Sequence, residues 1–149
     1  MSNSLGWGVR VIDDTLEGYP DIPHSIANYP VISLNFTFAM CSNLKEAPQI
    51  PITSMYMKGT FYGCEALEKA EITIPKHVTD IEAAFMWCSN LKGTINILAV
   101  PYKYDLCFYN TLGPITLRGK GFWVYDEIIN TAGNRYTPGS EIISWQEIK

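Results

Sequence analysis

One pattern recurs along this chain: a phenylalanine, a cysteine three residues later, and a leucine three residues after the cysteine. The phenylalanines of successive copies are 23, 24 and 23 residues apart. A fixed period in this range is typical of solenoids, in which each repeat forms one coil that stacks on its neighbours. The copies are Phe38-Ala-Met-Cys41-Ser-Asn-Leu44, Phe61-Tyr-Gly-Cys64-Glu-Ala-Leu67, Phe85-Met-Trp-Cys88-Ser-Asn-Leu91 and a degenerate Phe108-Tyr-Asn-Thr111-Leu112.

Each copy also predicts one short strand. After the leucine, residues 71–74 and 94–97 alternate between polar and aliphatic side chains, and residues 115–117 repeat this in the last copy. Alternation with period two is the mark of a strand with one buried face. Residues 78–85 are predicted as a helical turn, because Ile81 and Phe85 are spaced to share one helix face.

An aliphatic residue followed by proline precedes each phenylalanine, at Ile50-Pro51, Ile74-Pro75 and Val100-Pro101. The first two prolines lie ten residues before their phenylalanine and the third only seven, so the last coil is predicted to be shortened. Residues 22–26 (Ile-Pro-His-Ser-Ile) look like a degenerate first copy, separated from Phe38 by an insertion around residues 27–32.

The repeat position of the cysteines favours a structural role for them. Equivalent residues of stacked coils lie roughly 5 Å apart, so Cys41, Cys64 and Cys88 are predicted to form a buried column of free thiols. A free cysteine behaves as a small hydrophobic residue with a weak donor, which suits a tight interior corner. Two disulfides are the alternative, because the chain has an even number of cysteines, four in all.

These residues resemble the BspA-like leucine-rich repeat family, whose repeats read roughly I-P-x-x-V-T-x-I-x-x-A-F-x-x-C-x-x-L. Residues 74–91 follow that pattern closely. The resemblance covers about residues 22–117. It implies an α/β repeat fold: a short right-handed solenoid with one parallel strand per coil of 23–24 residues. Family members are often bacterial surface proteins that bind host proteins or other cells, and similar arrays occur in phage and prophage proteins.

The two ends are predicted to cap the solenoid, since open ends would expose apolar core and unpaired strand edges. Residues 8–12 alternate as a capping strand, with Trp7 and Val9 on one face. Residues 122–132 have helical spacing and residues 142–145 predict a final strand. The chain is thus predicted as a single domain over residues 1–149, with a cap at 1–21, a solenoid at 22–117 and a cap at 118–149.

Composition and motifs argue against catalysis and against several partners. A net charge of −4 with only 11 Lys and Arg gives no support for nucleic acid or an anionic membrane. No apolar run approaches a membrane span, and no leader is visible, so a cytoplasmic location is expected, with a virion or cell surface as the alternative. His24 and His77 lack a nucleophile motif, and no metal, cofactor or catalytic set is predicted.

The expected function is therefore binding. Tyr62, Trp87 and Tyr109 occupy variable positions between the phenylalanine and the cysteine, and Tyr102 and Tyr104 lie in the last coil. Tyrosine and tryptophan are favoured interface anchors, so these five are the predicted partner-binding residues. The expected partner is a protein, with a glycan as the alternative. Two other functions remain open: a small phage-encoded inhibitor of a host defence protein, and a structural domain of a virion or surface protein.

Overall fold

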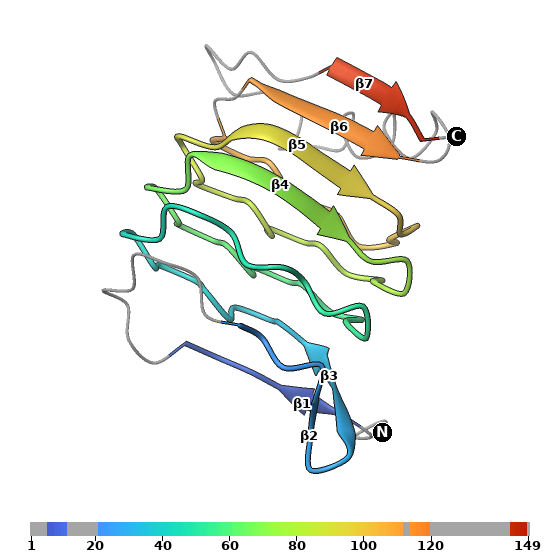
Figure 1. The fold of residues 1–149 in the computed structure, drawn as a ribbon. Coiled ribbons are helices and arrows are strands. Elements are labelled where there is room, and N and C mark those ends of the chain that lie inside the picture. Colours follow the sequence, from blue (N-terminus) through green and yellow to red (C-terminus); the bar gives the residue numbers. More distant parts are fainter. Residues whose placement is uncertain (1–5, 12–20, 112–113, 120–143, 149) are drawn as a thin grey trace.

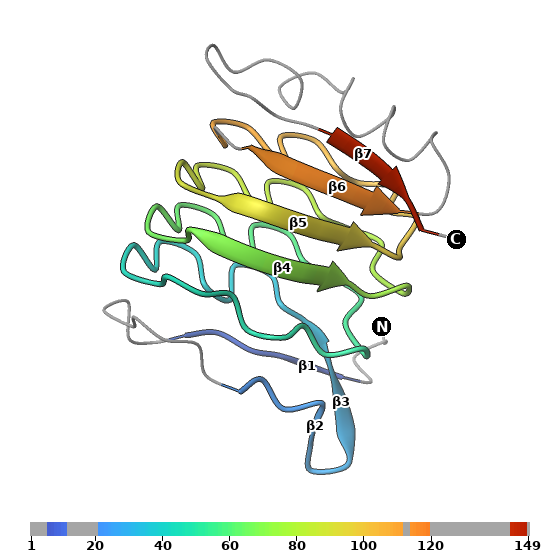
Figure 2. The same ribbon diagram turned by 45° about the horizontal axis from the view of Figure 1, so that its top comes forward.

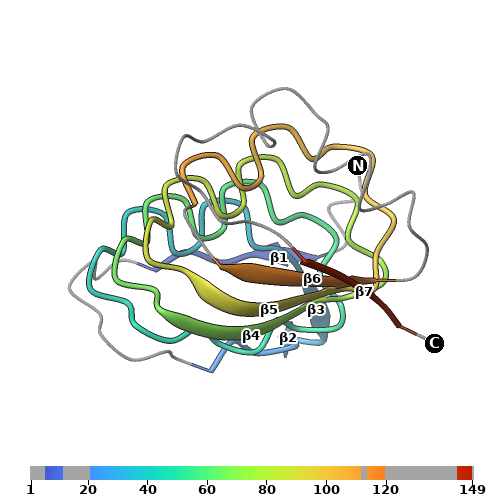
Figure 3. The ribbon, with the colours of Figure 1, turned by 90° about the horizontal axis from the view of Figure 1, so that it is seen from above.

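A computed structural model describes residues 6–11, 21–111, 114–119 and 144–148 of the chain. The chain forms a parallel β-solenoid of about four coils (Figure 1). Viewed from above, the main sheet lies on one side and turn-rich segments lie on the other (Figure 3). The described residues contain no helix, so the α/β character that the family resemblance implies is not confirmed.

The main sheet has four parallel strands, placed side by side in the order β4-β5-β6-β7 (Figure 2). In its register Ile72, Ile95, Leu117 and Trp145 are neighbours, so successive coils place equivalent residues together. The strands predicted at residues 71–74, 94–97 and 115–117 are confirmed. The final strand predicted at residues 142–145 is confirmed at Ser144 and Trp145, and its first two residues lie outside the described residues. The strands are β4 (Lys69–Ile74), β5 (Lys92–Ile97), β6 (Ile115–Gly119) and β7 (Ser144–Glu147).

A smaller sheet covers the start of the solenoid. It contains β1 (Trp7–Gly8), β2 (Ser25–Ile26) and β3 (Tyr29–Ser33), in the order β1-β3-β2. Strands β2 and β3 form a hairpin within the insertion that the sequence indicates, and its turn residues Ala27 and Asn28 both have positive φ. The amide of Val9 continues the β1–β3 pairing by donating to Ser33. The strand predicted at residues 8–12 is thus shorter and begins one residue earlier, because β1 ends at Gly8.

The segments opposite the main sheet are chains of tight turns, and the helical turn predicted at residues 78–85 is wrong. In the first coil the amides of Thr37, Ala39 and Cys41 each donate to the carbonyl three residues earlier, while alternate amides donate to the next coil. Two positions in each of these segments have positive φ, which breaks helical geometry. These positions are Phe36 and Met40, Gly59 and Gly63, Ala83 and Trp87, and Leu106 and Asn110.

The repeat residues form the core, as the sequence predicts. The four phenylalanines stack face to face, with ring centroids 5.4–5.6 Å apart, from Phe38 through Phe61 and Phe85 to Phe108. All four cysteines are free and buried, which confirms the thiol interpretation. The remaining repeat residues are buried as well: Cys41, Leu44, Cys64, Leu67, Cys88 and Leu91.

The predicted shortening of the last coil before Phe108 is wrong. The register pairs Ile74 with Ile97 and Asp80 with Lys103, an offset of 23 throughout this part of the coil. The equivalent of Ile74 is therefore Ile97, not Val100, and the residue that follows it is leucine instead of proline. The one-residue reduction comes later, where Gly93 pairs with Ile115.

The expectation of one strand per coil also fails in one place. Residues 46–50 run beside β4, but the main sheet ends at β4. Pro48 lies in this segment and Pro51 directly follows it, and proline has no N–H to donate to a ladder. The capping helix predicted at residues 122–132 lies outside the described residues.

Candidate partner-binding surfaces

The corner at which the chain leaves the strands carries the two most exposed large apolar side chains of the described residues, Ile52 at 70% and Tyr102 at 68%. Val100, 58% exposed, and Leu98, 38% exposed, lie at the same corner. Large apolar side chains gathered at such exposure commonly mark an interaction site. This corner, with the hollows beside it, is called the corner groove below.

The corner groove consists of two adjoining hollows of about 780 and 580 Å³ that share Lys76 and His77. The larger lies between residues 47–52 and strand β4, with Ile52 and Leu98 on its rim. The smaller lies beyond Lys76 and includes Val100. Both combine apolar walls with a few polar groups, as binding sites commonly do. The other polar side chains that line them are Gln49, Thr53, Glu71, Thr73 and Thr79.

The groove is open because the strand ladder stops there. In a parallel pair alternate residues direct their N–H and C=O groups to the same neighbour. Ile74 accepts a hydrogen bond from Leu98, the residue that follows β5, so Thr73 and Glu71 direct their backbone groups toward residues 46–50. Pro48, within that segment, cannot donate to them. The hollow lies beyond the point at which the first coil still bonds to the chain entering β4, where the amide of Glu68 donates to the carbonyl of Lys45.

A second candidate surface is the turn face, formed by the outward side chains of residues 35–40, 58–63, 82–87 and 105–110. Phe36, Met40 and Trp87 are 42–58% exposed on it. All three have positive φ, a strained conformation for bulky residues, which is retained mainly where the surrounding fold enforces it. Trp87 meets Tyr109 edge to face, with ring centroids 6.3 Å apart.

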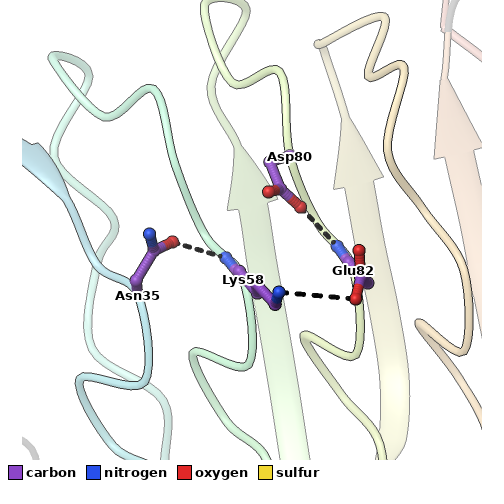
Figure 4. Close-up of polar contacts among 4 residues, drawn as sticks. All are labelled: Asn35, Lys58, Asp80 and Glu82. Atoms are coloured by element: carbon purple, nitrogen blue, oxygen red, sulfur yellow. Dashed lines mark hydrogen bonds and ion pairs between the residues drawn. The ribbon is translucent and has the colours of Figure 1, made fainter. Parts of the chain in front are cut away.

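A polar ladder runs along the turn face beside these apolar residues. The Asn35 side-chain oxygen accepts the Lys58 amide at 2.9 Å, and the Lys58 ammonium lies 3.6 Å from the Glu82 carboxylate (Figure 4). The Asp80 carboxylate accepts the Glu82 amide at 2.9 Å and holds this turn in place. Asp105 follows in the next coil, since its carbonyl accepts the amide of Ala83.

The five tyrosine and tryptophan residues predicted to bind a partner fall on two different surfaces. Tyr62, Trp87 and Tyr109 lie on the turn face, with Trp87 exposed and both tyrosines half-buried. Tyr102 lies at the corner groove, and Tyr104 packs partly buried against the core. The structure therefore does not bring all five together.

Sequence reasoning missed the aliphatic residues of the corner groove. The register aligns Val100 with His77 and Ile52 with Lys76, so aliphatic side chains stand at positions that are charged or polar in the neighbouring coil. This contrast could have identified the groove from the sequence. It becomes visible only when the coils are aligned with the correct number of residues between equivalent positions.

Three of the four cysteines have pKa values that disfavour the reactive thiolate. Burial, with a smaller contribution from neighbouring Cys41, raises the pKa of Cys64 from 9.0 to about 12. Burial likewise raises the pKa of Cys88 and of Cys107 well above the usual range. A thiol must ionise to react as a nucleophile, so such cysteines are inert.

Within the described ranges, no three His, Cys, Asp or Glu side chains gather closely enough to hold a metal ion. None of the segments that the structure describes forms an apolar helix of membrane-spanning length.

Comparison with known proteins gives no relative for this chain: no family model matches it, and neither the curated proteins nor the solved structures give a significant match.

Proposed function

We propose that this protein is a non-catalytic binding module that recognises a protein partner through the corner groove. One observation carries the proposal: Ile52 and Val100, each more than half exposed, line concave hollows, and the exposed Tyr102 is bonded through its amide to Thr79, which lines the second hollow. Burying such side chains in a partner releases about 25 cal/mol for each Å² of apolar surface.

The lining of the groove indicates the chemistry of the partner. Aliphatic walls fit apolar side chains, and Lys76, shared by both hollows, offers a cation at the middle of the groove. The proposed ligand is a protein segment with apolar side chains on either side of a carboxylate. A glycan fits less well, because sugar rings commonly stack on aromatic side chains and Tyr102 is the aromatic residue that the groove offers.

Site-specific crosslinking tests this proposal. A photo-reactive phenylalanine analogue at Val100 should form adducts with a protein in cells of the organism that produces this chain. The double substitution Ile52→Ser with Leu98→Ser should abolish these adducts. The control places the same analogue at Asn43, an exposed residue at the opposite corner of the coil. Equal adducts from both positions would contradict the proposal, and adducts that disappear on glycosidase treatment would favour a glycan.

We further propose that the array is a divergent relative of the BspA-like repeats. The agreement of residues 74–91 with that repeat, and the stacked phenylalanine and cysteine positions, support this relationship. The turn-rich segments in place of helices set the described coils apart from the α/β solenoid that the resemblance implies.

A further inference from the structure

The polar ladder of the turn face changes character from one end of the solenoid to the other. Its successive members are an amide, a cation and two carboxylates: Asn35, Lys58, Glu82 and Asp105. Lys58 and Glu82 pair within the chain, with side chains 42% and 34% exposed, so both charges also face solvent. Asp105 is exposed one coil further along, beside Glu82 and away from Lys58.

When this row of side chains is aligned with the same row in reverse order, the cation faces a carboxylate and the amide faces the other carboxylate. A two-fold axis across the coils, midway between Lys58 and Glu82, would set a second copy face to face with the coil order inverted. Lys58 of each copy would then meet Glu82 of the other, and Asp105 would meet Asn35. The Asn35 oxygen already accepts the Lys58 amide, and its nitrogen points away from that bond (Figure 4), free to donate to a carboxylate. Such self-complementarity is what a symmetric dimer requires.

The apolar positions beside the ladder fit the same operation. The inversion brings Trp87 over Gly63 of the second copy. The Met40 side chain of that second copy lies over Gly63, since a Cβ placed on Gly63 would be 2.5 Å from the Met40 sulfur. Trp87 therefore meets this methionine. Sulfur–aromatic contacts of this kind are favourable. In the neighbouring column Tyr109 comes over Ala39, a small side chain. Large residues of one copy thus face small or flexible ones of the other.

We propose that the turn face joins two copies of this chain in a symmetric dimer, with Lys58 of each copy on Glu82 of the other. Association buries the exposed Phe36, Met40 and Trp87 and combines four charges into one alternating network. It leaves the corner grooves of both copies outside the interface, so the dimer presents two partner-binding sites and gains avidity for a repeated ligand.

Sedimentation equilibrium with charge-reversed variants tests the dimer. The wild-type chain should sediment as a dimer, while Lys58→Glu alone and Glu82→Lys alone should be monomers, because each places like charges opposite one another. An equimolar mixture of the two variants should restore the dimer, since both contacts become complementary again. The pair within each chain stays broken in the mixture, so rescue reports the contact between chains.

Two controls separate this proposal from the one for the corner groove. Val100→Ser with Tyr102→Ser should leave the dimer intact, and circular dichroism should show that each charge variant is folded. If the wild-type chain stays monomeric at concentrations up to about 1 mM, the weak end of specific association, the dimer proposal is wrong. A dimer that survives both charge reversals, or variants that the mixture does not rescue, would overturn it too.

Discussion

The thiol of Cys88 donates a hydrogen bond to the carbonyl oxygen of Phe61 in the preceding coil, with 3.0 Å between sulfur and oxygen. Cys64 makes the equivalent bond to Phe38 at 3.1 Å, and Thr111 makes it to Phe85 at 2.7 Å with its hydroxyl. The repeated cysteine is therefore a small buried donor that ties one coil to the one before it.

Replacement of Cys88 by threonine or by valine distinguishes the contribution of its hydrogen bond from the contribution of its buried volume. The two side chains have the same shape, and only threonine can donate to Phe61, as Thr111 does to Phe85. Cys88→Thr should be more stable than Cys88→Val by about 1 kcal/mol, the net value of a typical hydrogen bond. Urea denaturation of both variants measures the difference, and equal midpoints would show that the cysteine serves only to fill space.

The buried thiols also predict how stability depends on pH. Their folded-state pKa values are raised, mainly by burial, so the unfolded chain loses these protons at lower pH than the folded chain does. Their contribution is complete below the unfolded pKa of 9.0 and is lost as the pH rises toward about 12, the folded value for Cys64. The loss approaches 1.4 kcal/mol per pH unit for each such thiol.

Denaturation midpoints at pH 8 and pH 10.5 check this prediction, with Cys64→Thr as the matched control that should lose less between the two. At pH 8 a thiol reagent should label Cys64, Cys88 and Cys107 in the unfolded chain and leave them unmodified in the folded one. Rapid labelling of any of the three in the folded chain would show that it is accessible and ionises normally.

The period of the sequence was enough to predict the solenoid and the cysteine column, because core positions repeat whatever path the chain takes between them. The path itself was mispredicted at residues 78–85. The inward residues Ile81, Ala84, Phe85 and Cys88 have the three-and-four spacing of a helix, but here that spacing arises from consecutive turns.

A signal for those turns was present in the preceding coil. Gly59 and Gly63 stand two residues on either side of Phe61, and both have positive φ. The next coil has Ala83 and Trp87 at these positions, and no other coil has glycine there, which hid the requirement. The binding surfaces could not be predicted, because exposure depends on the offset between coils, and the proline of Val100-Pro101 indicated a different offset from the one that the strands adopt.

Gly63→Ala tests the left-handed position directly. Its φ of +74° costs a residue with a Cβ roughly 1–2 kcal/mol, and the new methyl group would lie 2.5 Å from the Met40 sulfur. Gly63→Ala should therefore destabilise the fold by more than that strain alone. Adding Met40→Ala to this variant should remove the part of the destabilisation that comes from the clash and leave the part that comes from backbone strain. Additive effects in a double-mutant cycle would show that the two residues do not touch.

The phenylalanine stack predicts a difference between its middle and its end. Phe61 lies between two rings, at 5.5 Å from Phe38 and 5.6 Å from Phe85, whereas Phe38, in the first coil, stacks on Phe61 alone among the described residues. An aromatic pair contributes about 0.5–1.5 kcal/mol beyond the area that it buries. Phe61→Leu should thus lose two such pairs and Phe38→Leu one, because both rings are fully buried and the loss of volume is the same. Thermal unfolding followed by circular dichroism should place Phe61→Leu about 1 kcal/mol below Phe38→Leu in stability. An equal loss in the two variants would mean that the rings act as hydrophobic filling, and the regular stacking would then be a consequence of the coil spacing instead of a cause of it.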